Sequence, residues 1–102
     1  MKLHTLAHSR TGDKGDTSNI SIIAYRAEDY PLLCEHLTAE RVTAFFADLL
    51  EHGAAPVQRY VLANVQALNF VLPGILCGGV TRSLALDAHG KCLGSALLDL
   101  DL

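Results

Sequence analysis

The chain has 102 residues, of which 50% are hydrophobic and 19% charged. This length and composition predict one packed domain over residues 1–102 and exclude a disordered tail. The formal net charge is −3 and the eight lysines and arginines are scattered along the sequence. This pattern lacks the clustered basic surface on which binding to a phosphate backbone depends, and we expect no nucleic-acid partner.

The first predicted element is a short strand over Leu3–Ala7. From Asn19 the sequence NISIIAY alternates, which predicts a second strand over residues 19–25 with at least one buried side. Between them lies SRTGDKGDTSN, residues 9–19, without an aliphatic or aromatic side chain. We interpret this stretch as a long polar loop, and loops of that length in a compact domain are usually functional or disordered.

Two helices are predicted next. Asp29 is the expected N-cap of a short helix that runs through Leu37, with Pro31 in its first turn. The second helix has Thr38 as its cap and Gly53 just past its end. Large apolar side chains recur in it at helical spacing and are expected to face a sheet: Val42, Phe45, Phe46, Leu49 and Leu50.

The second half of the chain predicts mainly strands. Val57–Ala63 is expected to be a strand, whereas residues 64–79 are broken by proline and glycine and predict a turn or a short helix under the sheet. Val80–Leu86 alternates and predicts another strand, followed by a hairpin loop at DAHGK, residues 87–91. KCLGSALLDLDL, residues 91–102, is expected to return as a last strand at a sheet edge.

Helices in the middle and strands at both ends predict an α+β fold. The expected architecture is a two-layer sandwich, a mainly antiparallel sheet with helices on one face.

Cysteine and histidine spacing argues against a disulfide framework or a metal site, and without a cofactor fingerprint in the sequence we expect no cofactor. Cys34, Cys77 and Cys92 are an odd number without a CxxC pair, and the five histidines show no metal-ligand spacing. The N-terminal apolar run is too short for a signal peptide, and no segment approaches the ~20 apolar residues of a membrane span. We therefore expect a cytoplasmic protein with no membrane partner.

The polar stretch has the composition of an anion-binding segment. Gly12 and Gly15 permit backbone conformations that expose N–H groups, and Arg10 and Lys14 can reach the same space. Asp13 and Asp16 can hold these cations in place. The alternative is that the charged residues only cross-link a solvated loop. The spacing fits neither a P-loop nor an EF-hand, and GDKG alone is a weak match to the GXXG loop of nucleic-acid-binding domains.

Two more residues are candidates. Arg82 lies on an otherwise aliphatic strand face, so it extends its charged end to solvent, pairs with Asp13 or Asp16, or meets a ligand. His8, at the start of the polar stretch, is the one histidine placed to act as an acid or base.

The sequence resembles the C-terminal ferredoxin-fold domain of AtuA-like proteins, the acyclic terpene utilisation family, over nearly the whole chain. One matching segment is R-[ST]-G-D-K-G-D, here Arg10, Thr11, Gly12, Asp13, Lys14, Gly15 and Asp16. The other is LNF…GG-x-T-R-S, here Leu68, Asn69, Phe70, Gly78, Gly79, Thr81, Arg82 and Ser83. In that family the domain either follows a larger domain in one polypeptide or is a separate small protein, and this chain resembles the separate form.

The resemblance implies a ferredoxin-like sandwich and a larger AtuA-like partner, in a pathway that degrades acyclic terpenoid or branched compounds as coenzyme A thioesters. We therefore expect an accessory, substrate-binding subunit that presents an anion-binding site built from residues 10–16, Asn69 and Arg82. The resemblance assigns no catalytic residue. One alternative is a small enzyme with His8, Asp13 or Asp16 as acid and base and Lys14 and Arg82 as the clamp on an oxyanion. Another is a homodimeric scaffold paired through the last strand.

Overall fold

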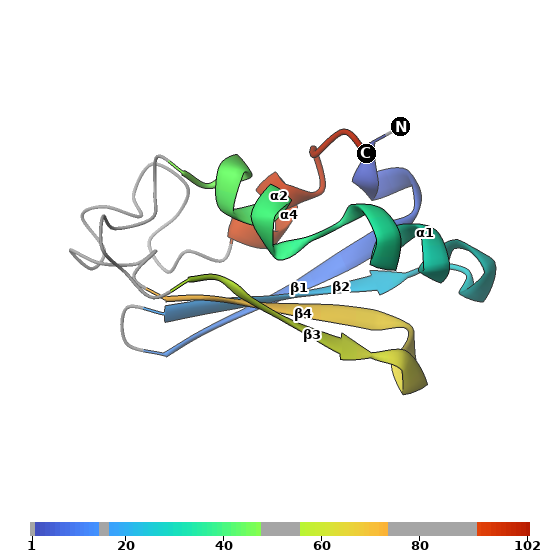
Figure 1. Cartoon of the computed structure of the whole chain (residues 1–102), viewed down its shortest axis with the longest axis horizontal. Coiled ribbons are helices and arrows are strands. Elements are labelled where there is room, and N and C mark those ends of the chain that lie inside the picture. The colour runs from blue at the N-terminus through green and yellow to red at the C-terminus, as the bar shows by residue number, and fades with distance from the viewer. Residues whose placement is uncertain (1, 15–16, 48–55, 74–91) are drawn as a thin grey trace.

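The computed structural model describes residues 2–14, 17–47, 56–73 and 92–102. Figure 1 shows a sheet with helices α1 (Tyr30–His36), α2 (Ala39–Phe45) and α4 (Cys92–Leu97) on one face of it. The described sheet has four strands in the order β1 (Ala7–Lys14), β2 (Thr17–Ala24), β4 (Ala67–Leu72) and β3 (Gln58–Leu62), and every pairing is antiparallel. The predicted α+β sandwich with helices on one face is therefore confirmed.

The four strands form two hairpins. The first joins β1 (Ala7–Lys14) to β2 (Thr17–Ala24), and the second joins β3 (Gln58–Leu62) to β4 (Ala67–Leu72) through the 3-10 helix η3 (Ala63–Val65). Strands β2 and β4 pair with each other at the centre of the sheet. The edges of the described sheet are thus β1 and β3.

The prediction of a long loop over residues 9–19 was wrong. Ser9 to Lys14 lie in β1, and Thr17 to Asn19 lie in β2, so nearly the whole polar stretch is a hairpin. The predicted strand at Leu3–Ala7 was also wrong, because Leu3–Thr5 is a 3-10 helix, η1, and β1 begins at Ala7. The strand expected at residues 19–25 is confirmed as the greater part of β2.

Helix α1 (Tyr30–His36) follows the 3-10 helix η2 (Ala27–Asp29), with Pro31 in its first turn as expected. Asp29 occupies the N-cap position but makes no capping hydrogen bond. Its carboxylate instead lies 3.5 Å from Nε of Arg26. The two-residue connection to α2 ends at Thr38, which is a true cap.

Helix α2 (Ala39–Phe45) begins as predicted, because Thr38 Oγ1 accepts a hydrogen bond of 3.2 Å from the Arg41 backbone N–H. The helix ends at Phe45, earlier than the expected stop at Gly53. Val42 and Phe46 are buried, but Phe45 is 38% exposed, so the predicted apolar stripe does not face the sheet throughout. Leu49, Leu50 and Gly53 lie outside the described residues.

The second half of the chain holds one confirmed strand and two corrections. The strand predicted at Val57–Ala63 is β3. Residues 64–79 were expected to lack a regular element, yet Ala67–Leu72 forms the central strand β4. Residues 91–102 were predicted to form a last strand, but Cys92–Leu97 forms helix α4. The strand expected at Val80–Leu86 and the hairpin loop at residues 87–91 lie outside the described residues.

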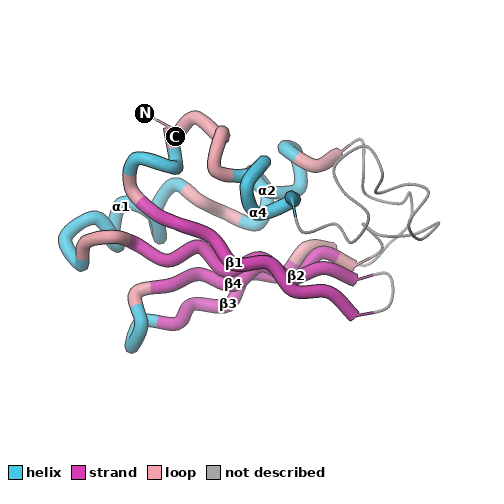
Figure 2. Tube along the Cα trace, turned by 180° about the vertical axis from the view of Figure 1, so that it is seen from behind, coloured by secondary structure: helices cyan, strands magenta, loops and turns pink. Residues whose placement is uncertain are grey.

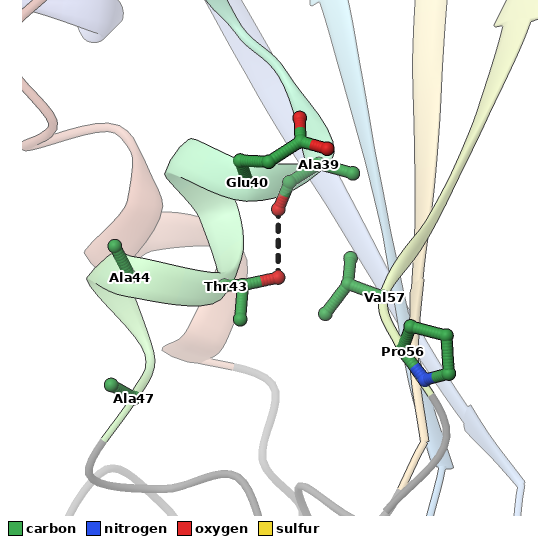
Figure 3. A pocket seen from close by; sticks show the side chains of 7 residues that line it. All are labelled: Ala39, Glu40, Thr43, Ala44, Ala47, Pro56 and Val57. Carbon is green, nitrogen blue, oxygen red and sulfur yellow. Dashed lines mark hydrogen bonds between the residues drawn. The ribbon is translucent and has the colours of Figure 1, made fainter.

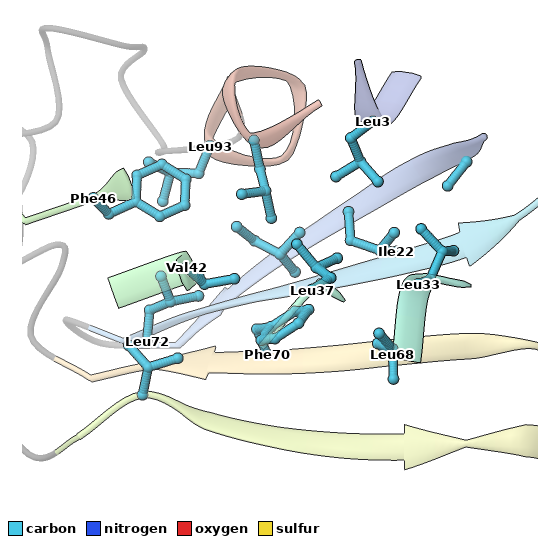
Figure 4. Packing of buried hydrophobic residues seen from close by; sticks show 14 of the residues in the cluster. Leu3, Ile22, Leu33, Leu37, Val42, Phe46, Leu68, Phe70, Leu72 and Leu93 are labelled. Carbon is cyan, nitrogen blue, oxygen red and sulfur yellow. The ribbon is translucent and has the colours of Figure 1, made fainter. Parts of the chain in front are cut away.

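The core lies between the sheet and the helical layer (Figure 4). Ile20, Ile22, Leu68, Phe70 and Leu72 are buried on the side of the sheet that faces the helices. The helical layer buries these side chains against them: Leu33, Leu37, Val42, Phe46, Leu93 and Leu97. Among the described residues no helix has the length and apolar character needed to cross a membrane.

Both ends of the chain are fixed to the body of the molecule and to each other. The backbone N–H of Leu3 donates to the carbonyl of Leu100 at 2.9 Å, and that of His4 donates to the carbonyl of Leu98 at 3.0 Å. Lys2 forms an antiparallel bridge with Asp101. The chain ends thus lie side by side on the helical side of the molecule (Figure 1).

A hydrogen bond from a tyrosine hydroxyl joins α1 to β4, and removal of this hydroxyl is expected to change stability by an amount that depends on pH. Tyr30 Oη donates to the carbonyl of Ala67 at 2.9 Å. Burial, and then a hydrogen bond with the Cys34 side chain, raise the pKa of Tyr30 above its ordinary value of 10.0. The pKa of Tyr30 is higher in the folded state than in the unfolded state. The stabilisation that Tyr30 provides is therefore complete below pH 10, and it is lost as the pH rises through the folded-state pKa.

Tyr30→Phe is therefore expected to lower the free energy of unfolding by about 1 kcal/mol at neutral pH, with a smaller difference from the wild type above pH ~10. Urea denaturation at neutral and at alkaline pH measures both values. Tyr25→Phe is the matched control, because Tyr25 is 61% exposed and should tolerate the change. Equal losses in the two variants would contradict the assigned role of the Ala67 carbonyl.

Candidate functional site on the open face of the sheet

The four-stranded sheet has one face that no described helix covers, which we call the open face. Figures 1 and 2 show from opposite sides that α1, α2 and α4 all lie on the other face. Along β2 the side chains of Ile20 and Ile22 are buried under the helices, while Asn19 and Ser21 point to the open face. The open face is therefore lined by alternate residues of each strand.

A row of polar residues crosses the open face at one level. Arg10 of β1 is opposite Ser21 of β2, Ser21 is opposite Asn69 of β4, and Asn69 is opposite Tyr60 of β3. We call these four residues the polar row. Neighbours in such a row have Cβ atoms about 5 Å apart, close enough to act on one ligand. Asn69 Nδ2 donates to Ser21 Oγ at 2.8 Å, which fixes the middle of the row.

Among the open-face side chains that the structure describes, Arg10 is the cation. Its side chain is exposed, and no ion pair or hydrogen bond joins its guanidinium to another residue in the described part of the chain. The open-face positions whose side chains the structure describes include no carboxylate: His8, Arg10, Gly12, Thr17, Asn19, Ser21, Ile23, Gln58, Tyr60, Leu62, Ala67, Asn69 and Val71. This face is suited to bind a negatively charged group.

Aromatic rings lie beside the polar row. The rings of His8 and Tyr25 have centroids 5.2 Å apart at an angle of 31°, and His8 precedes Arg10 by two residues on the same face of β1. At the other end of the row, the Tyr60 hydroxyl donates to Gln58 Oε1. The open face thus offers a cation, an amide and hydroxyl groups, with aromatic rings at both ends of the row.

The structure brings together two of the residues that the sequence singled out, Arg10 and Asn69. The side chain of Thr11 points the opposite way, and its Oγ1 accepts a 3.1 Å hydrogen bond from the backbone N–H of Gly94 in α4. Gly12 is on the open face, where Asn19 packs against it.

For two of the remaining predicted site residues, Asp13 and Lys14, the structure describes the backbone. The backbones of Asp13 and Lys14 end β1 opposite Ser18 and Thr17. Gly15, Asp16 and Arg82 lie outside the described residues.

Sequence reasoning missed Ser21 and Tyr60. Both were visible as polar or amphipathic residues on the less buried side of an alternating strand, but nothing in the sequence gives the register that aligns them. That register depends on the pairing of β2 with β4, and residues 64–79 were not recognised as containing a strand. Ser21 and Tyr60 therefore became site candidates only through the sheet.

A recess of about 410 Å³ lies on the opposite, helical side, between α2 and the residues that lead into β3 (Figure 3). Ala39, Ala44, Pro56 and Val57 give it an apolar lining, and the Thr43 hydroxyl there donates to the carbonyl of Ala39 at 2.8 Å. None of the sequence-predicted site residues that the structure describes lines it. In the part of the chain that the structure describes, no group of three or more His, Cys, Asp or Glu residues could hold a metal ion.

Comparison with known proteins identifies a family for the chain but no individual relative. Searches of curated proteins and of solved structures find no match. The family model described as the AtuA ferredoxin-like domain matches residues 1–102, which is the full length of the sequence. The match agrees with the antiparallel sheet and its helical layer, and it confirms the resemblance to this family. The chain belongs to the AtuA ferredoxin-like domain family.

Proposed function

We propose that this chain is a non-catalytic accessory subunit that docks against a larger AtuA-like protein through the open face of its sheet. In the assembly, Arg10, Ser21 and Asn69 form part of a site for a negatively charged acyl thioester of coenzyme A. The observation that carries the proposal is the polar row, which places an exposed arginine without a described partner beside a fixed amide and hydroxyl.

The geometry favours a shared site over a complete one. A ligand site is usually a concavity that buries most of its ligand, whereas the polar row lies on the exposed face of a sheet. A second protein surface placed over this face would supply the missing wall and exclude water, which strengthens the attraction between Arg10 and an anion. The proposal therefore changes the expected site from a loop over residues 10–16 to a sheet face that includes Arg10 and Asn69.

The test is to measure association of the chain with an AtuA-like partner by titration calorimetry, with and without a coenzyme A thioester. Arg10→Ala is expected to weaken association about tenfold or more, because arginines in the centre of an interface often dominate its binding energy. Asn69→Ala is expected to have a smaller effect in the same direction. The matched control is Arg26→Ala, since Arg26 is also an exposed arginine but precedes η2 and pairs with Glu28 at 3.2 Å.

Two results of this titration would refute the proposal. One is a failure of the wild-type chain to associate with the partner. The other is equal weakening by Arg10→Ala and Arg26→Ala, which would show a general charge effect without a role for the open face. Thioester turnover by the isolated chain would show that it is itself an enzyme.

A further inference from the structure

The edge of the sheet formed by β3 is open in the described part of the chain. Its residues pair with β4 in an unbroken register from Gln58↔Val71 to Leu62↔Ala67, and no described strand pairs with its other side. Figures 1 and 2 show β3 as the outermost described strand from both directions. Half of the backbone donors and acceptors of such a strand point away from the sheet and can pair with another strand.

This edge lacks the usual protection against pairing. Edge strands are commonly blocked by an exposed charge, a proline or a bulge, but β3 reads QRYVL and has a continuous register. Its one charged residue, Arg59, is directed inward, where Nη1 donates to the carbonyls of Cys34 at 2.8 Å and Leu37 at 2.9 Å. The charge of Arg59 is therefore held on the end of α1, away from the strand edge.

Large apolar side chains are exposed along the same strand and at its end. Tyr60 is 49% exposed, Val61 53%, Leu62 42%, and Val65 in η3 61%. Scattered exposed apolar residues are normal on a protein surface, but these four lie within six consecutive positions at one edge. A contiguous apolar patch beside unpaired backbone groups is the usual mark of an interaction surface.

We propose that β3 pairs with β3 of a second copy of this chain, antiparallel and about a two-fold axis at Tyr60. In this register Tyr60 lies opposite Tyr60 of the second copy. Gln58 lies opposite Leu62 of the second copy, and Arg59 lies opposite its Val61. The pairing thus places no cation opposite a cation, and the aliphatic stem of Arg59 can cover the exposed Val61. The same symmetry applied to the other edge, β1, would bring two exposed Arg10 side chains close together, which is unfavourable. The self-complementary edge is therefore β3.

The resulting dimer has one continuous sheet with both open faces on the same side. Arg10 lies three strands away from β3 in each copy, so Arg10, Ser21 and Asn69 remain available for the accessory role proposed above. The dimer does not depend on that role, because its paired residues all lie in β3.

Sedimentation velocity of the full chain over a wide range of concentration tests the pairing. The wild type is expected to approach twice the monomer mass as the concentration rises, while Val61→Lys remains monomeric because it places a charge on the edge. Tyr60→Lys is a second disrupting variant on the other face of the strand. Val65→Lys is the matched control, an equally exposed valine outside the strand, and should retain most of the association.

Circular dichroism establishes that each variant is folded before its mass is interpreted. Hydrogen exchange of the β3 amides gives an independent measurement, and their protection should rise with protein concentration in the wild type only. A wild type that stays monomeric at every concentration overturns the proposal, even if another protein binds the same edge. So does a dimer that is unaffected by both Val61→Lys and Tyr60→Lys.

Discussion

Replacing Arg59 with methionine is expected to lower the free energy of unfolding by about 2 to 3 kcal/mol. Arg59 extends from β3 under α1, and its Nη1 donates to two carbonyls at the end of that helix, those of Cys34 and Leu37. The last carbonyls of a helix have no partner within it, and a cation there also interacts favourably with the helix dipole. Methionine keeps most of the apolar stem but leaves both carbonyls without these bonds.

Urea denaturation measures the loss, and Arg26→Met is the comparison. Arg26 makes two ion pairs, with Glu28 and Asp29, but its side chain is 70% exposed. Surface pairs of this kind contribute ~0 to 1 kcal/mol, so this variant should lose little stability. Similar losses in the two variants would mean that the end of α1 does not depend on Arg59.

Gly94→Ala is expected to be the second most destabilising of these changes, at about 2 kcal/mol. A Cβ at Gly94 would lie 2.8 Å from Ser9 Oγ and closer still to Thr11 Oγ1, so the added methyl group forces α4 away from β1. Overpacking typically costs about 1 to 3 kcal/mol, although alanine recovers up to ~1 kcal/mol through its higher helix propensity. Displacement of α4 also breaks the hydrogen bond between Gly94 and Thr11.

Thermal or urea denaturation of a double-mutant cycle identifies the cause. Thr11→Ala removes the nearest atom, so it should lessen the cost of Gly94→Ala, and the two changes should be clearly non-additive. Ser95→Ala, at the exposed neighbouring position in α4, should be close to neutral. Additive effects of Thr11→Ala and Gly94→Ala would contradict the close approach of α4 to β1.

The close approach of α4 also explains why β1 could not be recognised from the sequence. A half-buried strand normally has an apolar residue at every second position. In β1 the inward positions Ser9 and Thr11 lie under a glycine, and this narrow space admits only small side chains. The outward positions are polar because they belong to the open face. Neither face of the strand therefore carries an apolar pattern, and composition alone indicated a loop.

Other elements show where a sequence pattern has two interpretations. In β4, Leu68, Phe70 and Leu72 alternate as in a strand, but the Pro73 that follows led us to expect a break. In the C-terminal segment Leu93 and Leu97 have helical spacing, whereas apolar and acidic residues alternate from Leu98 onward. Leu93 and Leu97 are both buried on helix α4. Only tertiary packing decides between such patterns. The fold class, β2, β3, α1 and the Thr38 cap were accessible from local chemistry, whereas the polar row required the register of β2 on β4.

The pairing of Lys2 to His4 with Leu98 to Asp101 has a practical meaning for any assembly that contains this domain. A polypeptide attached at either end departs from the same place, on the helical side (Figure 1). A fused reporter or affinity tag would therefore stand clear of the surface around Arg10 and Asn69, whichever end it occupies. A short linker could also join the two ends, so that the chain could be opened elsewhere without altering the sheet.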